Sequence, residues 1–196
     1  MMKFTKQVSL GVAATLMTAT AGCATMMDDQ GTTASGQNVP IVGGAPMYPT
    51  RNIIENAVNS QDHTTLVAAV KAAGLVDTLS GPGPFTVFAP TDSAFAKLPA
   101  GTVDTLVRSE NKATLTSILT YHVVPGRLSA ADIAAQAARN GGTLNLTTVA
   151  GGSIALSRAG NGWRITDAKG GTSTITIADV NQSNGVIHVI DTVLMP

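Results

Sequence analysis

Three histidines and one serine in a glycine-rich turn are the residues of this sequence that could most readily do chemistry. A hydrolase needs a nucleophile, a base and an orienting acid, but Ser153 in "GGSI" lies in a predicted β-turn and no Gly-x-Ser-x-Gly pattern occurs. A zinc site needs clustered ligands, whereas His63, His122 and His188 form no His-x-His or His-x-x-x-His pair. The sequence therefore predicts no catalytic residue, no metal site and no cofactor.

Charge and composition limit the kinds of partner. Twelve basic and twelve acidic residues give a formal net charge of zero, so no basic stripe is available to neutralise phosphates and we expect no nucleic-acid partner. Charged residues make up 12% of the chain, about half the usual share. This composition predicts a polar but weakly charged surface, rich in Ser, Thr, Asn and Gly.

The N-terminus has the layout of a secretory signal. Lys3 and Lys6 form a short positive region, and the segment from Val8 to Ala21 is apolar and uncharged. That segment is too short to span a bilayer comfortably as a helix. We therefore predict a signal peptide over residues 1–22 and an exported protein, located in the periplasm, the cell envelope or the extracellular space.

Cys23 is the only cysteine of the chain, so no internal disulfide can form. Its setting, "TAGC", resembles a bacterial lipoprotein processing site, where the cysteine receives lipid and becomes the first mature residue. Ala21 and Gly22 fit that pattern, whereas Thr20 stands where an aliphatic residue is expected. Two alternatives stay open: lipidation at Cys23, which would supply the contact with a membrane, or ordinary signal cleavage nearby that leaves a soluble exported protein.

The stretch that follows lacks any apolar period and is dominated by Gly, Pro and small polar residues. Such a stretch cannot bury enough apolar area to offset the entropy lost on ordering. We therefore predict a flexible tether over residues 23–47 and one domain over residues 48–196.

Helical patterns fill the first half of that domain. A first helix follows Thr50, which can cap it. A second begins near His63, which we expect to be exposed, and ends at Gly74, a residue suited to a left-handed helix end. An extended stretch at "FTVFAP" precedes further short helices, and Ser129 with Asp132 predicts the capped start of "SAADIAAQAARNGG".

From Thr143 onward the hydrophobic period changes to two, which is typical of strands. The stretch "TLNLTTVAGGSIALSR" predicts a strand, a Gly-Gly turn and a second strand. Asn161-Gly162 and Asn184-Gly185 are strong hairpin signals. Helices followed by an antiparallel meander indicate an α+β fold rather than alternating βαβ units.

Three stretches resemble signatures of the fasciclin domain family. "FTVFAPTDSAFAKLP" (Phe85 to Pro99) is similar to the first signature, "YHVV" (Tyr121 to Val124) to the central Tyr-His motif, and "NGVIHVIDTVLMP" (Asn184 to Pro196) to the closing signature. The resemblance implies a fasciclin-like two-layer β-sandwich or wedge with several helices packed on one side. It also implies that the final strand returns to pair near the first signature.

Members of this family are secreted or surface-anchored, act mostly in adhesion and are not generally enzymatic. We therefore expect a non-catalytic adhesion or interaction module for cell–cell, cell–matrix or host–microbe contact. Its partner would be an unknown protein or polysaccharide at the cell surface. The alternative is an exported carrier of an apolar small molecule, such as a carotenoid or lipid, held in a cleft between the sheet and the helices.

Three residues are candidates for partner binding. Tyr121 and His122 match a contact region of adhesive relatives, although we expect His122 to be primarily structural and to fasten a strand to the helical layer. Trp163, beside a hairpin turn, is either a cross-strand packing residue or an exposed anchor for a partner. We expect His188, in a half-buried strand, to be hydrogen-bonded and neutral.

Overall fold

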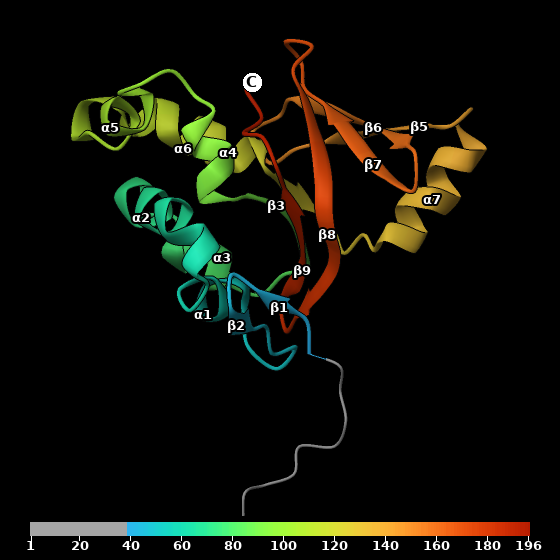
Figure 1. Ribbon diagram of the computed structural model, residues 1–196, viewed down its shortest axis with the longest axis horizontal. Coiled ribbons are helices and arrows are strands. Elements are labelled where there is room, and N and C mark those ends of the chain that lie inside the picture. The colour runs from blue at the N-terminus through green and yellow to red at the C-terminus, as the bar shows by residue number, and fades with distance from the viewer. Residues whose placement is uncertain (1–38) are drawn as a thin grey trace, which may run out of the picture. The chain divides into compact units, whose positions relative to one another are not determined.

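Helices fill the first half of the described chain and strands fill the second (Figure 1). The computed structural model describes residues 39–196, so the predicted signal peptide, Cys23 and most of the predicted tether lie outside these residues. The helices are α1 (Ile53–Ala57), α2 (Thr64–Ala73), α3 (Val76–Ser80), α4 (Asp92–Ala96), α5 (Thr102–Leu106), α6 (Lys112–Tyr121) and α7 (Ala130–Arg139), with 3₁₀ turns η1 (Gln61–His63) and η2 (Ser109–Asn111). None of these helices is long and apolar enough to cross a membrane.

Seven strands form one folded-over sheet in the order β4-β3-β9-β8-β7-β6-β5. Their bounds are β3 (Phe85–Pro90), β4 (Val123–Pro125), β5 (Thr143–Thr147), β6 (Ser153–Ala159), β7 (Gly162–Thr166), β8 (Thr172–Gln182) and β9 (Gly185–Ile190). The pair β3–β9 is parallel and the other neighbours are antiparallel. The predicted meander and the return of the last strand to the first signature are therefore both confirmed.

The long strand β8 connects two layers of the sheet. Residues Thr172–Thr174 pair with β7, whereas the rest of β8 pairs with β9 through two register shifts between Ile175 and Val180. Such bulges bend a strand and increase its twist. Figure 1 shows the result: β7, β6 and β5 turn away from β9 and β3. The helices α1–α6 lie on one side of the central strands, and β5–β7 with α7 lie on the other. This is the predicted α+β arrangement.

Two apolar cores occupy the two sides of the central strands. The first contains buried side chains of α1, α2, α4 and α6 with Val87 and Ile187 of β3 and β9. The second contains Phe88 and Ile190 of the same two strands, side chains of β5–β7, and Ile133 of α7. Because each face of the central strands is covered, all six residues of β9 are buried. The expectation that His188 lies in a half-buried strand was therefore wrong.

Capping residues fix the helix ends. Asn52, not Thr50, caps α1: its side chain accepts a hydrogen bond from the Glu55 N–H, and Glu55 returns the bond to the Asn52 N–H. The predicted caps of α7, Ser129 with Asp132, and of α2, Gly74 at φ 74°, are confirmed.

The fold begins earlier than the sequence suggests. Residues 41–47, assigned to the tether, form the small hairpin β1 (Ile41–Val42) and β2 (Ala45–Pro46) and continue to Met47. Val42 and Met47 are each 2% exposed and belong to the first core. Gly43 and Gly44 adopt positive φ at the hairpin turn, and these glycines made the stretch resemble a flexible linker.

Candidate functional site

The Tyr-His motif lies where α6 ends and β4 begins. His122 is 3% exposed. Its Nε2 accepts a hydrogen bond from the Leu194 N–H at 2.9 Å, so its ring proton lies on Nδ1 and is donated to the Ile118 carbonyl at 2.8 Å. Its own carbonyl accepts from the Phe88 N–H of β3. His122 thus joins a helix, a strand and the C-terminal segment.

Burial lowers the pKa of His122 to about 4, because desolvation penalises the charged imidazolium, while the Ile118 carbonyl and Asp167 raise the pKa by less. The ring is therefore neutral at neutral pH. With both nitrogens already paired, it offers neither a base nor a metal ligand.

Tyr121 joins the same region to the second layer of the sheet. Its hydroxyl donates to the Ser153 carbonyl at 2.7 Å and accepts from the Ala168 N–H at 3.0 Å. The side chain is fully buried, and burial raises the pKa of its phenol. Gly152 touches the ring so closely that a Cβ there would lie 2.6 Å from Cε2. The ring is therefore held by shape as well as by hydrogen bonds.

Asp167 provides a second attachment for the C-terminal segment. Its Oδ1 accepts from the Lys169 and Gly171 N–H groups at 3.0 and 2.7 Å, and its Oδ2 accepts from the Met195 N–H at 3.1 Å. Two consecutive backbone N–H groups, those of Leu194 and Met195, are thus held by side chains from distant segments.

His188 is hydrogen-bonded and neutral, as expected. Its Nδ1 accepts from the Asp179 N–H at 3.3 Å and its Nε2 donates to the Leu128 carbonyl at 2.9 Å. Burial lowers its pKa, and its ring stacks on Phe88 with centroids 5.7 Å apart.

The structure places all three partner-binding candidates inside the domain. Trp163 is 5% exposed because its strand turns the indole toward the second core, where the guanidinium of its cross-strand neighbour Arg158 lies 5.0 Å from the ring centroid. Tyr121 and His122 are equally inaccessible. The prediction that these three residues contact a partner at the surface is therefore corrected: Trp163 packs in the second core, and Tyr121 and His122 attach neighbouring segments to one another.

His63 is the residue whose setting the sequence analysis missed. It was expected to be exposed, but it is 4% exposed. Its Nδ1 lies 2.8 Å from Ser60 Oγ, and its buried Nε2 makes no hydrogen bond of good geometry within the described residues, although the Ala89 carbonyl is close enough to act on the ring. Burial lowers its pKa, and the Ala89 carbonyl and nearby carboxylates raise it by less. The hairpin at residues 41–46, which was counted as tether, is part of what covers this region.

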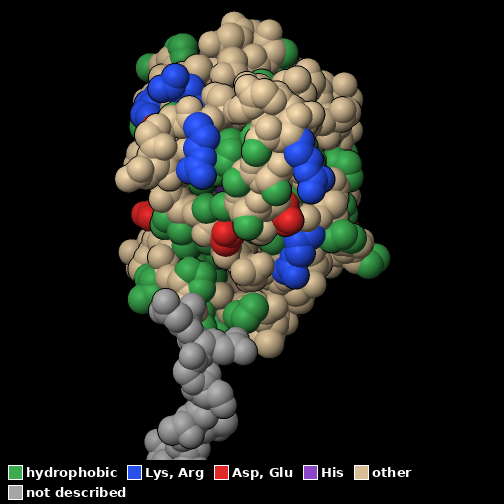
Figure 2. All heavy atoms as spheres, turned by 90° about the vertical axis from the view of Figure 1, so that its right-hand side faces the viewer, with side chains coloured by type: hydrophobic (Ala, Val, Ile, Leu, Met, Phe, Trp, Pro, Cys, Tyr) green, Lys and Arg blue, Asp and Glu red, His purple; other side chains and the backbone are tan. Residues whose placement is uncertain are grey.

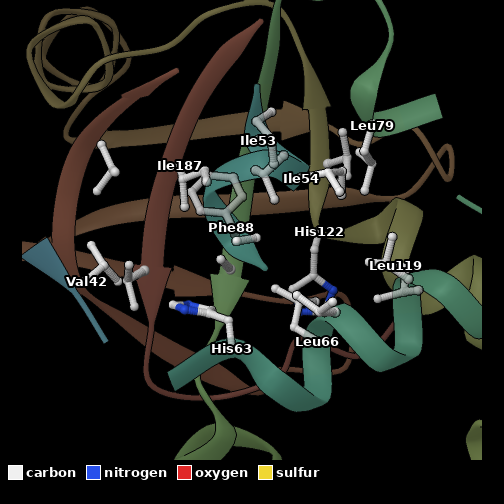
Figure 3. A pocket seen from close by; sticks show the side chains of 18 of the residues that line it. Val42, Ile53, Ile54, His63, Leu66, Leu79, Phe88, Leu119, His122 and Ile187 are labelled. Atoms are coloured by element: carbon white, nitrogen blue, oxygen red, sulfur yellow. The ribbon is translucent and has the colours of Figure 1, made fainter. Parts of the chain in front are cut away.

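His63 lines a small apolar cavity between the helices and the central strands. Its volume is about 50 Å³. Figure 3 shows His63 and His122 among apolar side chains, including Leu66, Ile187 and Val42. Ligand pockets usually measure about 300–1,000 Å³, so the cavity has no room for the extended hydrocarbon of the carrier hypothesis unless the helices separate.

The hydrogen-bonded pair Ser60 and His63 resembles part of a catalytic triad, but it does not complete one. Within residues 39–196, no carboxylate binds the second ring nitrogen of His63, and Ser60 is 3% exposed. Among residues 39–196, no group of three or more His, Cys, Asp or Glu side chains is placed to hold a metal ion.

Comparisons with known proteins agree with this architecture. The sequence profile described as Fasciclin domain matches residues 61–196. Protein sll1483 of Synechocystis sp. is 46% identical over 157 residues, which cover 80% of this chain and 79% of that protein. The cell surface glycolipoprotein MPB83 of Mycobacterium bovis is 37% identical over 145 residues, which cover 71% of this chain and 58% of that protein.

A solved structure shares the fold. The FAS1 domain pair of the insect cell adhesion molecule fasciclin I superposes with a TM-score of 0.66 at 21% identity, covering 74% of this chain and 51% of that chain. At this identity the likeness concerns the fold alone.

Proposed function

Because the chain belongs to the fasciclin domain family, we propose that it is a non-catalytic interaction module for cell–cell, cell–matrix or host–microbe adhesion. This proposal rests on the observation that the side chains best suited to chemistry are buried and engaged in hydrogen bonds. Tyr121, His122 and His188 are buried and paired with backbone groups of distant segments. They stabilise a rigid scaffold, and what remains for function is the outer surface.

One outer surface, formed by β5–β8, is mostly polar. Paired residues on neighbouring strands point to the same side of a sheet, and on β5–β8 the buried partners Leu144, Leu156 and Ile165 alternate with polar residues. The register places the polar set on the other side, which we name the hydroxyl face: Thr143, Asn145, Thr147, Ser153, Ser157, Arg164, Thr166, Thr172 and Thr174.

The chemistry of the hydroxyl face suits a neutral or weakly charged partner. It carries hydroxyl and amide groups with one cation, Arg164, and no carboxylate, and the register places Ala155 and Ala159 among them. Figure 2 shows a different side of the domain, where α7 lies and where Lys, Arg, Asp and Glu side chains are scattered over a polar and apolar surface. A protein or polysaccharide at the cell surface, recognised by many weak hydrogen bonds, fits these properties.

Display in many copies would strengthen such weak contacts. MPB83 is described as a cell surface glycolipoprotein, which supports export for this chain, and lipid on Cys23 would hold the domain at a membrane. Mass spectrometry of the mature N-terminus tests this part. A diacylglycerol-modified Cys23 is expected, and an unmodified N-terminus would exclude lipid anchoring without affecting the adhesion proposal.

Adhesion is tested with beads that carry residues 39–196 in many copies, presented to cells and envelope fragments of the native host. The unmodified domain is expected to retain beads on the partner surface. The double substitution Asn145→Arg with Thr174→Arg places two bulky charges on the hydroxyl face and should reduce retention about tenfold or more.

The control is Thr114→Arg with Ser117→Arg, which adds the same charge to exposed positions of α6. Retention by this control should equal that of the unmodified domain, and both variants should melt normally. If both variants retain beads equally well, the hydroxyl face is not the contact. If the unmodified domain retains none on any envelope surface, the adhesion proposal itself fails.

A further inference from the structure

The exposed apolar side chains of the domain are concentrated near its N-terminal end. Among residues 39–196, five large apolar side chains are exposed, and three of them lie within residues 41–58. Ile41 is the most exposed of the five, at 67%, and Tyr48 is 39% exposed. Single exposed apolar residues are normal on a protein surface, so the arrangement of these side chains decides whether they form a contact surface.

The β1–β2 hairpin gives these side chains a common orientation. Ile41 and Pro46 are cross-strand partners and are both exposed, whereas the other pair of the hairpin, Val42 and Ala45, is buried. Tyr48 follows Pro46 by two positions, with one buried residue between them, so the alternation of the hairpin continues to it. We name the surface formed by Ile41, Pro46 and Tyr48 the hairpin patch.

Hydrogen bonds fix the backbone that carries the hairpin patch. The Tyr48 N–H donates to Asn56 Oδ1 at 3.2 Å, and the side-chain amide of Asn56 donates to the Tyr48 carbonyl at 2.7 Å. The Gln61 N–H donates to the Gly43 carbonyl at 3.0 Å, which attaches the hairpin turn to the segment after α1. Docking of the patch therefore orders little additional backbone, and its entropic cost is low.

The chemistry of the hairpin patch matches the interfacial region of a bilayer. The guanidinium carbon of Arg51 lies 4.9 Å from the centroid of the Tyr48 ring, and both side chains are exposed. Tyrosine rings and long basic side chains are favoured where a membrane meets water. An exposed apolar side chain such as Ile41 can enter the boundary between headgroups and acyl chains. The combination suits a shallow contact with lipid.

The position of Cys23 indicates which surface can reach this patch. Residues 24–38 separate Cys23 from Val39, where the described domain begins. This separation is at most about 60 Å even for a fully extended chain. With lipid on Cys23, the patch would therefore be present at the bilayer surface at an effective concentration on the order of millimolar or higher. A contact too weak to bind membranes alone would then be populated.

We propose that the hairpin patch docks on the membrane to which Cys23 is attached, with Ile41 and Tyr48 at the level of the lipid headgroups. This inference rests on the lipid anchor of the proposed function and adds an orientation to it. In Figure 1 the hairpin lies at the end of the domain where β8 ends, whereas β5–β7 lie toward the opposite end. Docking would therefore hold the hydroxyl face away from the bilayer, where a partner can reach it.

The test couples residues 23–196 to a maleimide-bearing lipid in phosphatidylcholine nanodiscs. Cys23 is the only cysteine, so the attachment is unique and does not depend on how the cell modifies it. A small fraction of the lipids carries a gadolinium chelate, which broadens nearby methyl NMR signals. The methyl signals of Val42, beside Ile41, should broaden strongly, and those of Val149, in the turn between β5 and β6, should broaden weakly. Protein with a blocked Cys23 should show little broadening of either.

Matched substitutions test which apolar side chains make the contact. Ile41→Ser with Tyr48→Ser should lower the ratio of docked to undocked domain about tenfold or more, so the Val42 signals should sharpen. The control, Val107→Ser with Val149→Ser, removes two other exposed apolar side chains and should leave the Val42 broadening unchanged. Melting temperatures establish that both variants fold, and the comparison within the unmodified protein stands without either variant.

Equal broadening of Val42 and Val149 in the unmodified protein would overturn the proposal, and so would Val42 broadening that survives the patch substitutions. Sedimentation of the uncoupled protein as a dimer that Ile41→Ser dissociates would assign the patch to a second copy of the chain instead. An unmodified Cys23 in the native host would overturn the anchor of the proposed function and, with it, docking in the cell. Sharp Val42 signals in the nanodiscs would overturn docking alone, so the two failures are distinguishable.

Discussion

At the scale of single residues, His122 and His188 are neutral rings that connect distant segments through hydrogen bonds. His122 and His188 each accept a backbone N–H at one ring nitrogen and donate from the other, in each case to a segment far away in sequence. A neutral imidazole can do both only when it carries a single ring proton. Protonation of either ring at low pH therefore removes its ability to accept the backbone N–H hydrogen bond.

Replacement of His122 by alanine tests the fastening role. His122→Ala leaves the Leu194 N–H and the Ile118 carbonyl without partners and opens a void, so the free energy of unfolding should fall by about 3–5 kcal/mol at pH 7.5. Thr114→Ala, at an exposed position of the same helix, should change it by less than about 0.5 kcal/mol. An unchanged melting temperature together with lost binding would instead identify His122 as a contact.

The same variant has a pH signature. The pKa of His122 falls from its ordinary value of 6.5 to about 4 on folding, so its contribution to stability is complete above pH 6.5. That contribution is lost as the pH falls through 4, amounting to about 3 kcal/mol for the unmodified domain. Urea titrations between pH 7.5 and 4 should show a shallower decline for His122→Ala, and parallel declines would contradict the assignment.

The contrast between His188 and His63 shows what sequence can predict about single residues. His188 alternates with β-branched residues in a strand, so the local period predicted a hydrogen-bonded, neutral ring but not a strand that is buried on both faces. His63 stands near a helix start, among polar neighbours, and nothing local predicts that its ring is buried. Its burial depends on the hairpin at residues 41–46 and on strands from the other end of the chain.

At the scale of elements, the turn between β8 and β9 does more than reverse the chain. The hairpin predicted from Asn184-Gly185 is confirmed, but its loop is Ser183-Asn184, because Gly185 begins β9 and pairs with Gln182. The structure adds that the Asn184 side chain accepts from the Ile53 N–H at 3.0 Å and donates to the Leu79 and Gly81 carbonyls at 2.8 and 3.0 Å. One turn residue thus attaches the sheet to α1 and α3, which turn propensity could not reveal.

Substitution of the two hairpin asparagines should therefore have unequal effects. Asn184→Ala removes three hydrogen bonds between elements and should lower the free energy of unfolding by about 2–4 kcal/mol. Asn161→Ala changes an exposed turn residue and should cost less than about 1 kcal/mol. Urea denaturation of both variants provides the measurement, and equal losses would show that Asn184 acts only through the turn.

At the scale of the whole molecule, the sequence predicted the fold class and the order of elements but misplaced the start of the domain. Periodicity and caps are local signals, so α2, β3, α7 and the meander were predictable. The hairpin at residues 41–46 has two very short strands and two turn glycines. Its place in the fold comes from Val42 and Met47 entering the first core, a long-range effect that composition conceals.

A chain that begins at residue 48, as the sequence boundary suggests, should be less stable than one that begins at residue 39. The shorter chain loses the burial of Val42 and Met47, each worth about 1.5–3 kcal/mol before the entropy of ordering is subtracted. The net loss should be about 2 kcal/mol, and thermal denaturation should show a melting temperature lower by about 4–8 °C. Equal melting temperatures would show that the hairpin is not part of the stable fold.

The parallel pair β3–β9 at the centre of the sheet also affects the order in which parts of the domain can fold. Phe85 pairs with Gly185, one hundred positions later in the chain, and contacts of such long range form slowly. Strand β9 contributes Ile187 and Val189 to the first core and Ile190 to the second, so both cores are completed only when the last segment is available. A chain that emerges from a channel N-terminus first would thus complete its two cores only after nearly all of it had passed.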